Sequence, residues 1–167
     1  MAGTGERKKG RLSHLDASGR ARMVDVSAKQ VTAREAVAQA TVTMRRSTLE
    51  LITGGGIEKG DVLAVAQVAG IMAAKKASEI IPMCHPIAIT GVDLEFKVDE
   101  EASAITAVVT ARTRDRTGIE MEALTGAAVA ALTIYDMCKA VDRDMAVTEV
   151  KLLFKTGGKS GTYRREE

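Results

Sequence analysis

Alternating apolar and polar positions predict four strands in this chain. Apolar side chains occupy every second position in four segments: Arg34 to Met44, Ile87 to Val98, Ala104 to Arg114 and Thr148 to Phe154. A period of two is typical of a strand with one buried face. The first segment is rich in Ala, a poor strand former, so a helix is the alternative interpretation there. The polar turn Asp99-Glu100-Glu101 predicts that the second and third segments form an antiparallel hairpin.

Helical spacing and capping residues predict three helices between these strands. Asp61 can cap a helix from Val62 to about Ile80, whose apolar residues fall along one stripe. A capping box of Ser47 and Glu50 can begin a short helix, which a run of three glycines then ends. The segment from Gly118 to Lys139 is rich in Ala, Leu, Met and Glu and predicts a long helix.

The order strand, helix, strand, strand, helix, strand predicts an α+β fold of the ferredoxin-like (split β-α-β) type. We expect an antiparallel four-stranded sheet with helices packed on one face. Nothing else in the chain covers the apolar residues of the other sheet face, which favours a homo-oligomer. Both ends are rich in Gly, Lys, Arg and Ser, so we expect a flexible N-terminal tail over residues 1–19, a single folded domain over residues 20–157 and a loose C-terminal tail over residues 158–167.

Composition excludes several classes of protein. Aromatic residues are 2% of the 167 residues, which argues against the stacking platforms that hold single-stranded nucleic acid. Charge interrupts every apolar stretch, and the N-terminus has no apolar secretory signal, so we expect neither a membrane span nor export. Cys84 and Cys138 are the only cysteines, which suits a reducing cytosol and no disulfide framework.

The net charge is +2, and the N-terminal segment with Arg7, Lys8, Lys9 and Arg11 against Glu6 carries more than this whole excess. We interpret this segment as a solvated tail, with polyanion binding as the alternative.

A short turn between two prolines presents His85. The other histidine of the sequence is His14. Pro82 and Pro86 each fix their own φ, so the turn gives the side chain a defined orientation. A structural histidine is the alternative. A Cys84/His85 zinc site lacks a second pair of ligands, and adjacent residues of an extended segment point to opposite sides, so the two would not form a direct nucleophile–base pair.

Acidic and basic residues mark both ends of the predicted long helix. Asp136 and Lys139 share one face near its end, and apolar neighbours predict that the pair is partly buried, which would lower the lysine pKa. An exposed ion pair is the alternative. Glu120 and Glu122 open the same helix, where complementing the helix dipole is already a sufficient role.

Glycine-rich segments with lysines are typical of anion sites. Lys59 lies between a run of glycines and a helix start, and the segment from Lys155 to Gly161 combines Lys, Gly and Ser. The segment around Lys59 does not have the P-loop spacing, and a flexible tail is the alternative interpretation of the segment from Lys155 to Gly161. With Lys29 and Arg34 these cations suit a polyphosphate, although spacing alone does not show that they converge.

Seven motifs, in order along the chain, resemble those of a known family. They are Met23-Val24-Asp25-Val26-Ser27-Ala28-Lys29, Lys59-Gly60-Asp61, Ala69-Gly70-Ile71-Met72-Ala73-Ala74-Lys75, Ile81-Pro82-Met83-Cys84-His85-Pro86, Gly118-Ile119-Glu120-Met121-Glu122-Ala123-Leu124-Thr125, Tyr135-Asp136-Met137-Cys138-Lys139 and Lys155-Thr156-Gly157-Gly158-Lys159-Ser160-Gly161. From about Leu12 to Gly161 the chain resembles the MoaC family, the cyclic pyranopterin monophosphate synthase accessory proteins of molybdenum cofactor biosynthesis.

The resemblance implies a cytoplasmic phosphorus–oxygen lyase whose folded domain is catalytic. Its substrate would be (8S)-3',8-cyclo-7,8-dihydroguanosine 5'-triphosphate, a cyclised GTP supplied by a radical cyclase, and its products cyclic pyranopterin monophosphate and diphosphate. The resemblance implies that Asp136, Lys59 and Lys139 are catalytic. It implies substrate contacts from Met83, Cys84, His85, Glu120, Met121, Glu122, Asp25, Lys29, Arg34 and Lys155.

The resemblance also implies a homohexamer, a trimer of dimers with pockets between subunits, that needs neither nucleic acid nor membrane. We assign no metal ligands and no cofactor from the sequence, and Mg²⁺ bound with the triphosphate stays an open alternative. Two other functions compete with this one. A module that merely binds a pterin or nucleotide would need the cations but not Asp136, and a nucleic-acid-binding protein would depend on the basic tail.

Overall fold

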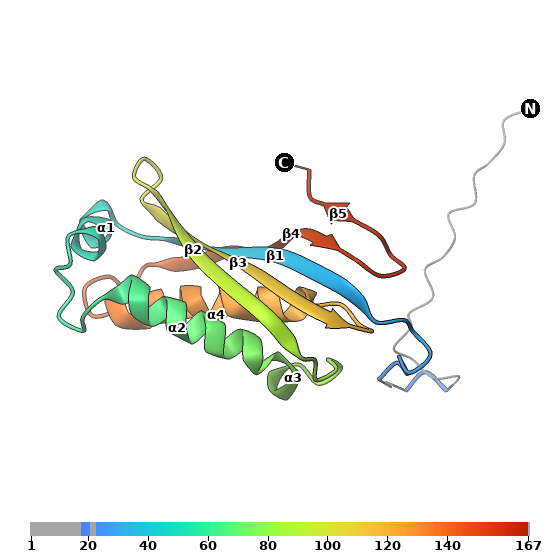
Figure 1. Ribbon diagram of the computed structural model, residues 1–167. Helices are drawn as coiled ribbons and strands as arrows, with labels where there is room; N and C mark the ends of the chain where they lie inside the picture. Colours follow the sequence, from blue (N-terminus) through green and yellow to red (C-terminus); the bar gives the residue numbers. More distant parts are fainter. Residues whose placement is uncertain (1–17, 21–22, 167) are drawn as a thin grey trace, which may run out of the picture.

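The computed structural model describes residues 18–20 and 23–166. The basic segment Arg7 to Arg11 and His14 therefore lie outside the described residues. Over the described part, the chain forms one antiparallel sheet with helices on one of its faces (Figure 1). The predicted α+β, ferredoxin-like arrangement is confirmed. The helices of this part are all too short or too polar to cross a lipid bilayer.

The sheet contains the four predicted strands and one more. Its strand order is β2-β3-β1-β4-β5, and every pair is antiparallel. The bounds are β1 Thr32–Thr43, β2 Ile89–Asp99, β3 Ala104–Asp115, β4 Ala146–Thr156 and β5 Tyr163–Arg164. The two-residue β5 pairs with the end of β4 and lies within the segment for which the sequence predicts a loose tail.

The alanine-rich segment is a strand, β1, at the centre of the sheet. Ala36, Ala38 and Ala40 are fully buried on the face that packs against the long helix α4 (Glu120–Cys138). Their small side chains let α4 approach the sheet closely, while hydrogen bonds to β3 and β4 on both sides fix the extended backbone. Pairing with two neighbours therefore overrides the weak strand propensity of Ala.

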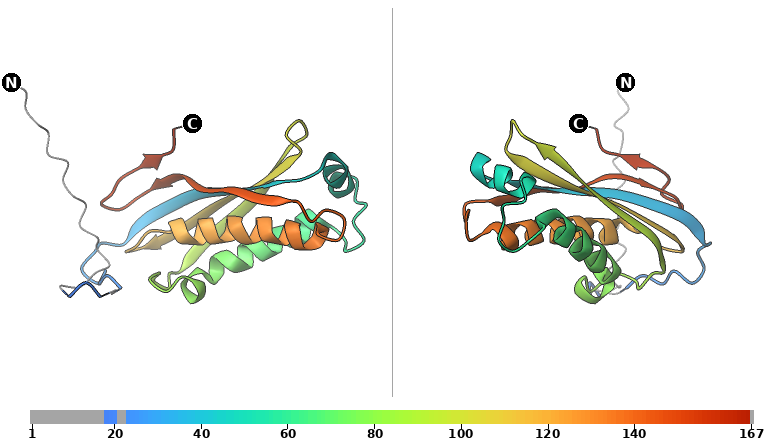
Figure 2. Two further views of the ribbon diagram at one scale, coloured as in Figure 1. Left: turned by 180° about the vertical axis from the view of Figure 1, so that it is seen from behind. Right: turned by 60° about the vertical axis from the view of Figure 1, so that its left-hand side comes forward.

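Helices α2 (Val62–Lys75) and α4 lie side by side under the sheet (Figure 2). Asp61 caps α2 as predicted, since its carboxylate accepts from the Ala64 N–H at 3.0 Å. The prediction that this helix continues to Ile80 is wrong. The backbone leaves helical geometry at Lys76 (ψ 10°), and a separate four-residue helix, α3 (Ala77–Ile80), follows.

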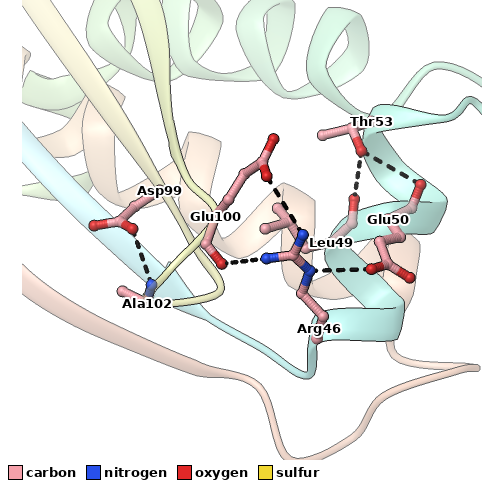
Figure 3. Close-up of polar contacts among 7 residues, drawn as sticks. All are labelled: Arg46, Leu49, Glu50, Thr53, Asp99, Glu100 and Ala102. Atoms are coloured by element: carbon pink, nitrogen blue, oxygen red, sulfur yellow. Dashed lines mark hydrogen bonds and ion pairs between the residues drawn. The ribbon is translucent and has the colours of Figure 1, made fainter.

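The short helix α1 (Arg46–Thr53) exists, but its predicted capping box is wrong. The helix begins one residue before Ser47, so Ser47 lies inside the first turn and Arg45 occupies the N-cap position without a side-chain cap. Glu50 instead accepts from the Arg46 guanidinium at 3.0 Å, and the same guanidinium reaches Glu100 in the β2–β3 turn (Figure 3). Gly54 ends the helix as expected.

These elements place two loops at opposite ends of the helical layer. The loop that carries Lys59 follows α1 at one end, and the Pro82–Pro86 turn follows α3 at the other (Figure 1). Each loop lies beside one end of α4. The fold therefore places the candidate site residues at two separate places on a single chain.

Candidate active site

A cavity of about 430 Å³ opens at the N-terminal end of α4. Three segments meet there: the start of the helix, the turn between the two prolines, and the extended stretch from Val24 to Lys29. The fold thus brings together residues that are far apart in the sequence. The predicted substrate-binding residues that line the cavity are Lys29, Met83, Cys84, His85, Glu120, Met121 and Glu122.

The proline-bounded turn holds His85 in a fixed place at this cavity. The His85 Nε2 atom is 2.7 Å from the main-chain oxygen of Val24, which orients the ring. Asp25 is adjacent in sequence to that partner but is itself exposed, and its carboxylate accepts from the Ser27 N–H and hydroxyl. These bonds from Ser27, with a smaller contribution from the charge of His85, lower the Asp25 pKa.

The two glutamates of the cavity are in opposite electrostatic states. Glu122 is 4% exposed, and burial, with a smaller contribution from the charge of Glu120, raises its pKa to about 7. Burial also acts to raise the Glu120 pKa, but the Lys155 ammonium, 2.9 Å from the Glu120 carboxylate, reverses this effect and lowers it overall. The cavity therefore pairs a permanently charged carboxylate with one that can hold a proton near neutral pH.

The Cys84 thiol is poorly suited to act as a nucleophile. Burial, and then the charge of Glu122, raise its pKa, so the thiol keeps its proton near neutral pH. No group of three or more His, Cys, Asp or Glu residues in the described ranges is arranged to hold a metal ion.

A second hollow, of about 520 Å³, adjoins the first and shares Lys29 with it. Lys29, Arg34 and Lys159 line this hollow together with Gly158. Gly157 and Gly158 have φ values of +96° and +71°, and a Cβ on Gly158 would lie 2.2 Å from the Arg34 guanidinium. At Gly157 a Cβ would lie 2.3 Å from the main-chain oxygen of Ala33, so glycine is required there, and the loop packs directly against Arg34.

The three residues that the resemblance makes catalytic meet at the opposite end of α4. The Lys139 ammonium is 2.6 Å from one oxygen of the Asp136 carboxylate, and the Lys59 ammonium is 3.6 Å from the other. Lys59 also donates to the main-chain oxygen of Asp136 at 2.9 Å. The fold therefore brings Lys59 next to Asp136 and Lys139 within one chain, although Lys59 is far from both in the sequence.

The expectation that this group is buried is wrong for the single chain. The side chains of Asp136 and Lys139 are 60% and 52% exposed, because this end of α4 faces solvent. The hydrogen bond that Lys139 donates to Asp136, together with the negative charge of Asp136, raises the Lys139 pKa instead of lowering it. The hydrogen bond and charge of Lys139, followed by the charge of Lys59, lower the pKa of Asp136.

The cavity and the lysine–aspartate group do not meet within one chain. Glu120 and Asp136 are separated by most of the 19-residue helix α4, whose rise of 1.5 Å per residue places them about 24 Å apart. The cavity and the lysine–aspartate group each contain part of the predicted site. Within the described part of the single chain, no other segment covers the exposed side chains of Lys59 and Lys139.

Two groups of polar residues were not among the candidates drawn from the sequence. Lys159 was recognised within a glycine-rich motif but not singled out, and only the tertiary structure sets it beside Arg34. Asp142 and Thr48 are both 1% exposed, and the Thr48 hydroxyl donates to the Asp142 carboxylate at 3.0 Å. A lone aspartate after a helix carries no sequence signal of burial, so this pair could not have been predicted.

Comparison with known proteins shows the family of proteins to which this chain belongs. The profile of the family described as "MoaC family" matches residues 23–158, so the chain belongs to the MoaC family. A protein of Peptoclostridium acidaminophilum named cyclic pyranopterin monophosphate synthase is 62% identical over 93% of this chain and 98% of its own length. Proteins of that name from Thermoanaerobacter pseudethanolicus and Heliobacterium modesticaldum are 61% and 58% identical over 93% of this chain and 98% of theirs.

Proposed function

We propose that this chain is a cyclic pyranopterin monophosphate synthase of molybdenum cofactor biosynthesis. It converts a cyclised guanosine triphosphate to cyclic pyranopterin monophosphate and diphosphate, and as a phosphorus–oxygen lyase it closes a cyclic phosphate. The observation that carries this proposal is the cavity at the start of α4. That cavity combines an oriented His85, a Glu122 that holds a proton near neutral pH, and an adjoining hollow lined by cations.

The cations account for binding and for the leaving group. Lys29, Arg34 and Lys155 hold the triphosphate, and Lys159 extends the same positive surface. When a hydroxyl of the substrate displaces diphosphate, negative charge grows on the departing oxygen, and fixed cations stabilise that charge. Mg²⁺ that accompanies the triphosphate is part of the substrate.

The acids and bases account for the rearrangement of the ring. Opening the purine and closing the pyrazine ring require protons to move between nitrogen and carbon, which calls for groups that both give and take protons near pH 7. Glu122 has a suitable pKa of about 7 in the single chain. Lys139 and Lys59 act with Asp136, which holds both ammonium groups in place.

For these groups to act on one substrate, two chains must share each site. The two ends of α4 are about 24 Å apart, so the catalytic group of one chain has to face the cavity of another. A two-fold axis across the middle of α4 achieves this, because it reverses the helix direction in the second copy. The neighbouring chain then covers Lys59 and Lys139 and keeps water away from them while they act on the substrate.

The outer face of the helical layer suits such a contact. Val65, Val68 and Met72 recur at three- and four-residue spacing on α2 and are 46%, 58% and 53% exposed. Leu132 of α4 is exposed as well. An apolar stripe of this kind on a surface helix is typical of an interface. Three such dimers, joined by other surfaces, give the homohexamer.

The reducing cytoplasm suits this enzyme, because both Cys84 and Cys138 are free thiols. The test of the function is turnover of the cyclised nucleotide by the purified protein, followed by release of diphosphate and by the pterin product. Tight binding with no diphosphate released would instead select a binding module.

A further inference from the structure

Asp142 is a buried carboxylate that the proposed chemistry does not use. It follows α4 directly and is 1% exposed. One of its oxygens accepts from the Arg45 N–H at 2.9 Å and from the Thr48 hydroxyl at 3.0 Å. Its other oxygen lies 3.2 Å from the Arg45 Nε and accepts from the Asp144 N–H at 3.2 Å. A buried charge with this many donors is held firmly in one position.

The bonds of Asp142 connect the start of α1 to the end of α4. The Asp142 N–H donates to the Cys138 carbonyl at 3.1 Å, in the last turn of the helix that carries Asp136 and Lys139. The Arg45 guanidinium also bonds the Val141 carbonyl. The N-terminus of α1 is thereby fixed to the segment that follows the catalytic group.

Another connection between α1 and the end of α4 runs through the loop that carries Lys59. Helix α1 leads from Arg45 into the glycine-rich loop that carries Lys59. The Lys59 ammonium then donates a hydrogen bond to the main-chain oxygen of Asp136 in α4. Along this loop Ile57 is 9% exposed and packs in the core, so the loop cannot adjust freely to a displaced α1. The position of Lys59 relative to Asp136 thus depends on how α1 is seated.

We propose that Asp142 is a positioning residue, which seats α1 on the end of α4 and so sets the contact between Lys59 and Asp136. This inference rests on the proposed function, in which that contact is catalytic. Asp142 itself touches none of the three catalytic side chains, and it acts only through α1 and the Lys59 loop.

A second connection to α1 offers a matched comparison. Arg46, next to Arg45, bonds the main-chain oxygen and the carboxylate of Glu100, which ties the same helix to the β2–β3 turn (Figure 3). The Arg46 and Glu100 side chains are 54% and 76% exposed. Solvent weakens an exposed ion pair, so we assign the seating of α1 to Asp142 and not to Glu100.

The direct test is the Asp142→Asn variant, with Glu100→Gln and Asp144→Asn as controls. The titration of the Asp136 carboxyl carbon, followed by NMR in the purified full chain, reports the contact without any assay of turnover. In the wild type, the bond from Lys139 and the charge of Lys59 lower the Asp136 pKa. We expect Asp142→Asn to move this pKa back towards its ordinary value, because Lys59 withdraws, and we expect both controls to leave it unchanged.

Turnover supplies the second readout. We expect Asp142→Asn to lower kcat by about tenfold to a hundredfold, with KM within about twofold, because a displaced catalytic group costs rate more than binding. A folded Asp142→Asn protein with an unchanged Asp136 pKa overturns the inference. If the wild-type chain shows no turnover, the proposed function fails, while the Asp136 titration still decides the role of Asp142.

If Asp142→Asn does not fold, Thr48→Val replaces it. This variant removes one donor and keeps the carboxylate charged. We expect a smaller movement of the Asp136 pKa in the same direction, and an unchanged Asp136 titration in folded Thr48→Val would also overturn the inference.

Discussion

The Lys59 ammonium donates a hydrogen bond of 2.9 Å to the main-chain oxygen of Asp136, a residue 77 positions further along the chain. The same ammonium is 3.6 Å from the Asp136 carboxylate, which Lys139 contacts from the other side at 2.6 Å. Two ammonium groups therefore share one carboxylate. Such a carboxylate stays ionised near neutral pH and pairs with both lysines.

Removing the charge of Asp136 should abolish most of the turnover and little of the stability. We expect Asp136→Asn to lower kcat by at least about a hundredfold, since general acid–base groups contribute that much or more. Its side chain is 60% exposed, so the melting temperature should stay close to that of the wild type. Diphosphate release measures the first effect and calorimetry the second. Full turnover in this variant, with Asp144→Asn as the control, would contradict the assignment.

Sharing of sites between chains predicts that two inactive variants can restore one another. Lys59→Ala damages one end of α4 and Glu122→Gln the other, so a mixed dimer contains one intact and one doubly damaged site. After random exchange of subunits we expect about a quarter of the wild-type diphosphate release. Mixing Lys59→Ala with Asp136→Asn, which damage the same end, is the control and should restore nothing. Equal activity of the two mixtures would refute a shared site.

The raised pKa of Glu122 predicts how stability depends on pH. In the folded chain Glu122 keeps its proton up to about pH 7, whereas in the unfolded chain it releases it near its ordinary value of 4.5. The unfolded state binds fewer protons in this window, so Glu122 makes the fold less stable as the pH rises through it. Glu122→Gln removes this loss, and relative to wild type it should gain up to about 3 kcal/mol between about pH 5 and about pH 8.

Urea denaturation at the two pH values, at one fixed protein concentration, measures this gain. Glu58 is exposed, so Glu58→Gln should show no pH-dependent gain. A pH-independent difference between Glu122→Gln and wild type would show that Glu122 is ionised in the folded protein.

The close contact between α2 and α4 at Gly70 predicts that adding a single methyl group there lowers the stability of the fold. A Cβ at Gly70 would lie 2.9 Å from the main-chain oxygen of Gly126, 2.5 Å from Leu94 Cδ1 and 3.2 Å from the Cβ of Ala130. The backbone oxygen cannot move aside, so Gly70→Ala should lose about 1–3 kcal/mol of unfolding free energy to overpacking, despite the higher helix propensity of Ala. At Gly91 a Cβ would meet nothing closer than 3.9 Å, and Gly91→Ala should be nearly neutral. Equal stability of the two variants by urea denaturation would disprove a tight crossing.

Periodicity alone determined most of the fold. The four alternating segments became β1 to β4, and the cap at Asp61 and the long helix before Lys139 formed as predicted, because these features depend on neighbouring residues. The break at Lys76 and the start of α1 were mispredicted. At Lys76 the backbone leaves helical geometry, although the apolar spacing continues beyond it. At the start of α1 the Arg45 N–H bonds the carboxylate of Asp142, a residue far away in the sequence.

The sequence also supplied the chemical groups of the site, since motifs record which side chains are present. Only the tertiary structure decided their distribution. A helix is rigid, so α4 holds Glu122 and Asp136 at opposite ends, while long-range packing brings Lys59 to Asp136 and Lys155 to Glu120. The burial that raises the Glu122 pKa and the exposure of Lys139 likewise come from packing between distant segments, which no local pattern encodes.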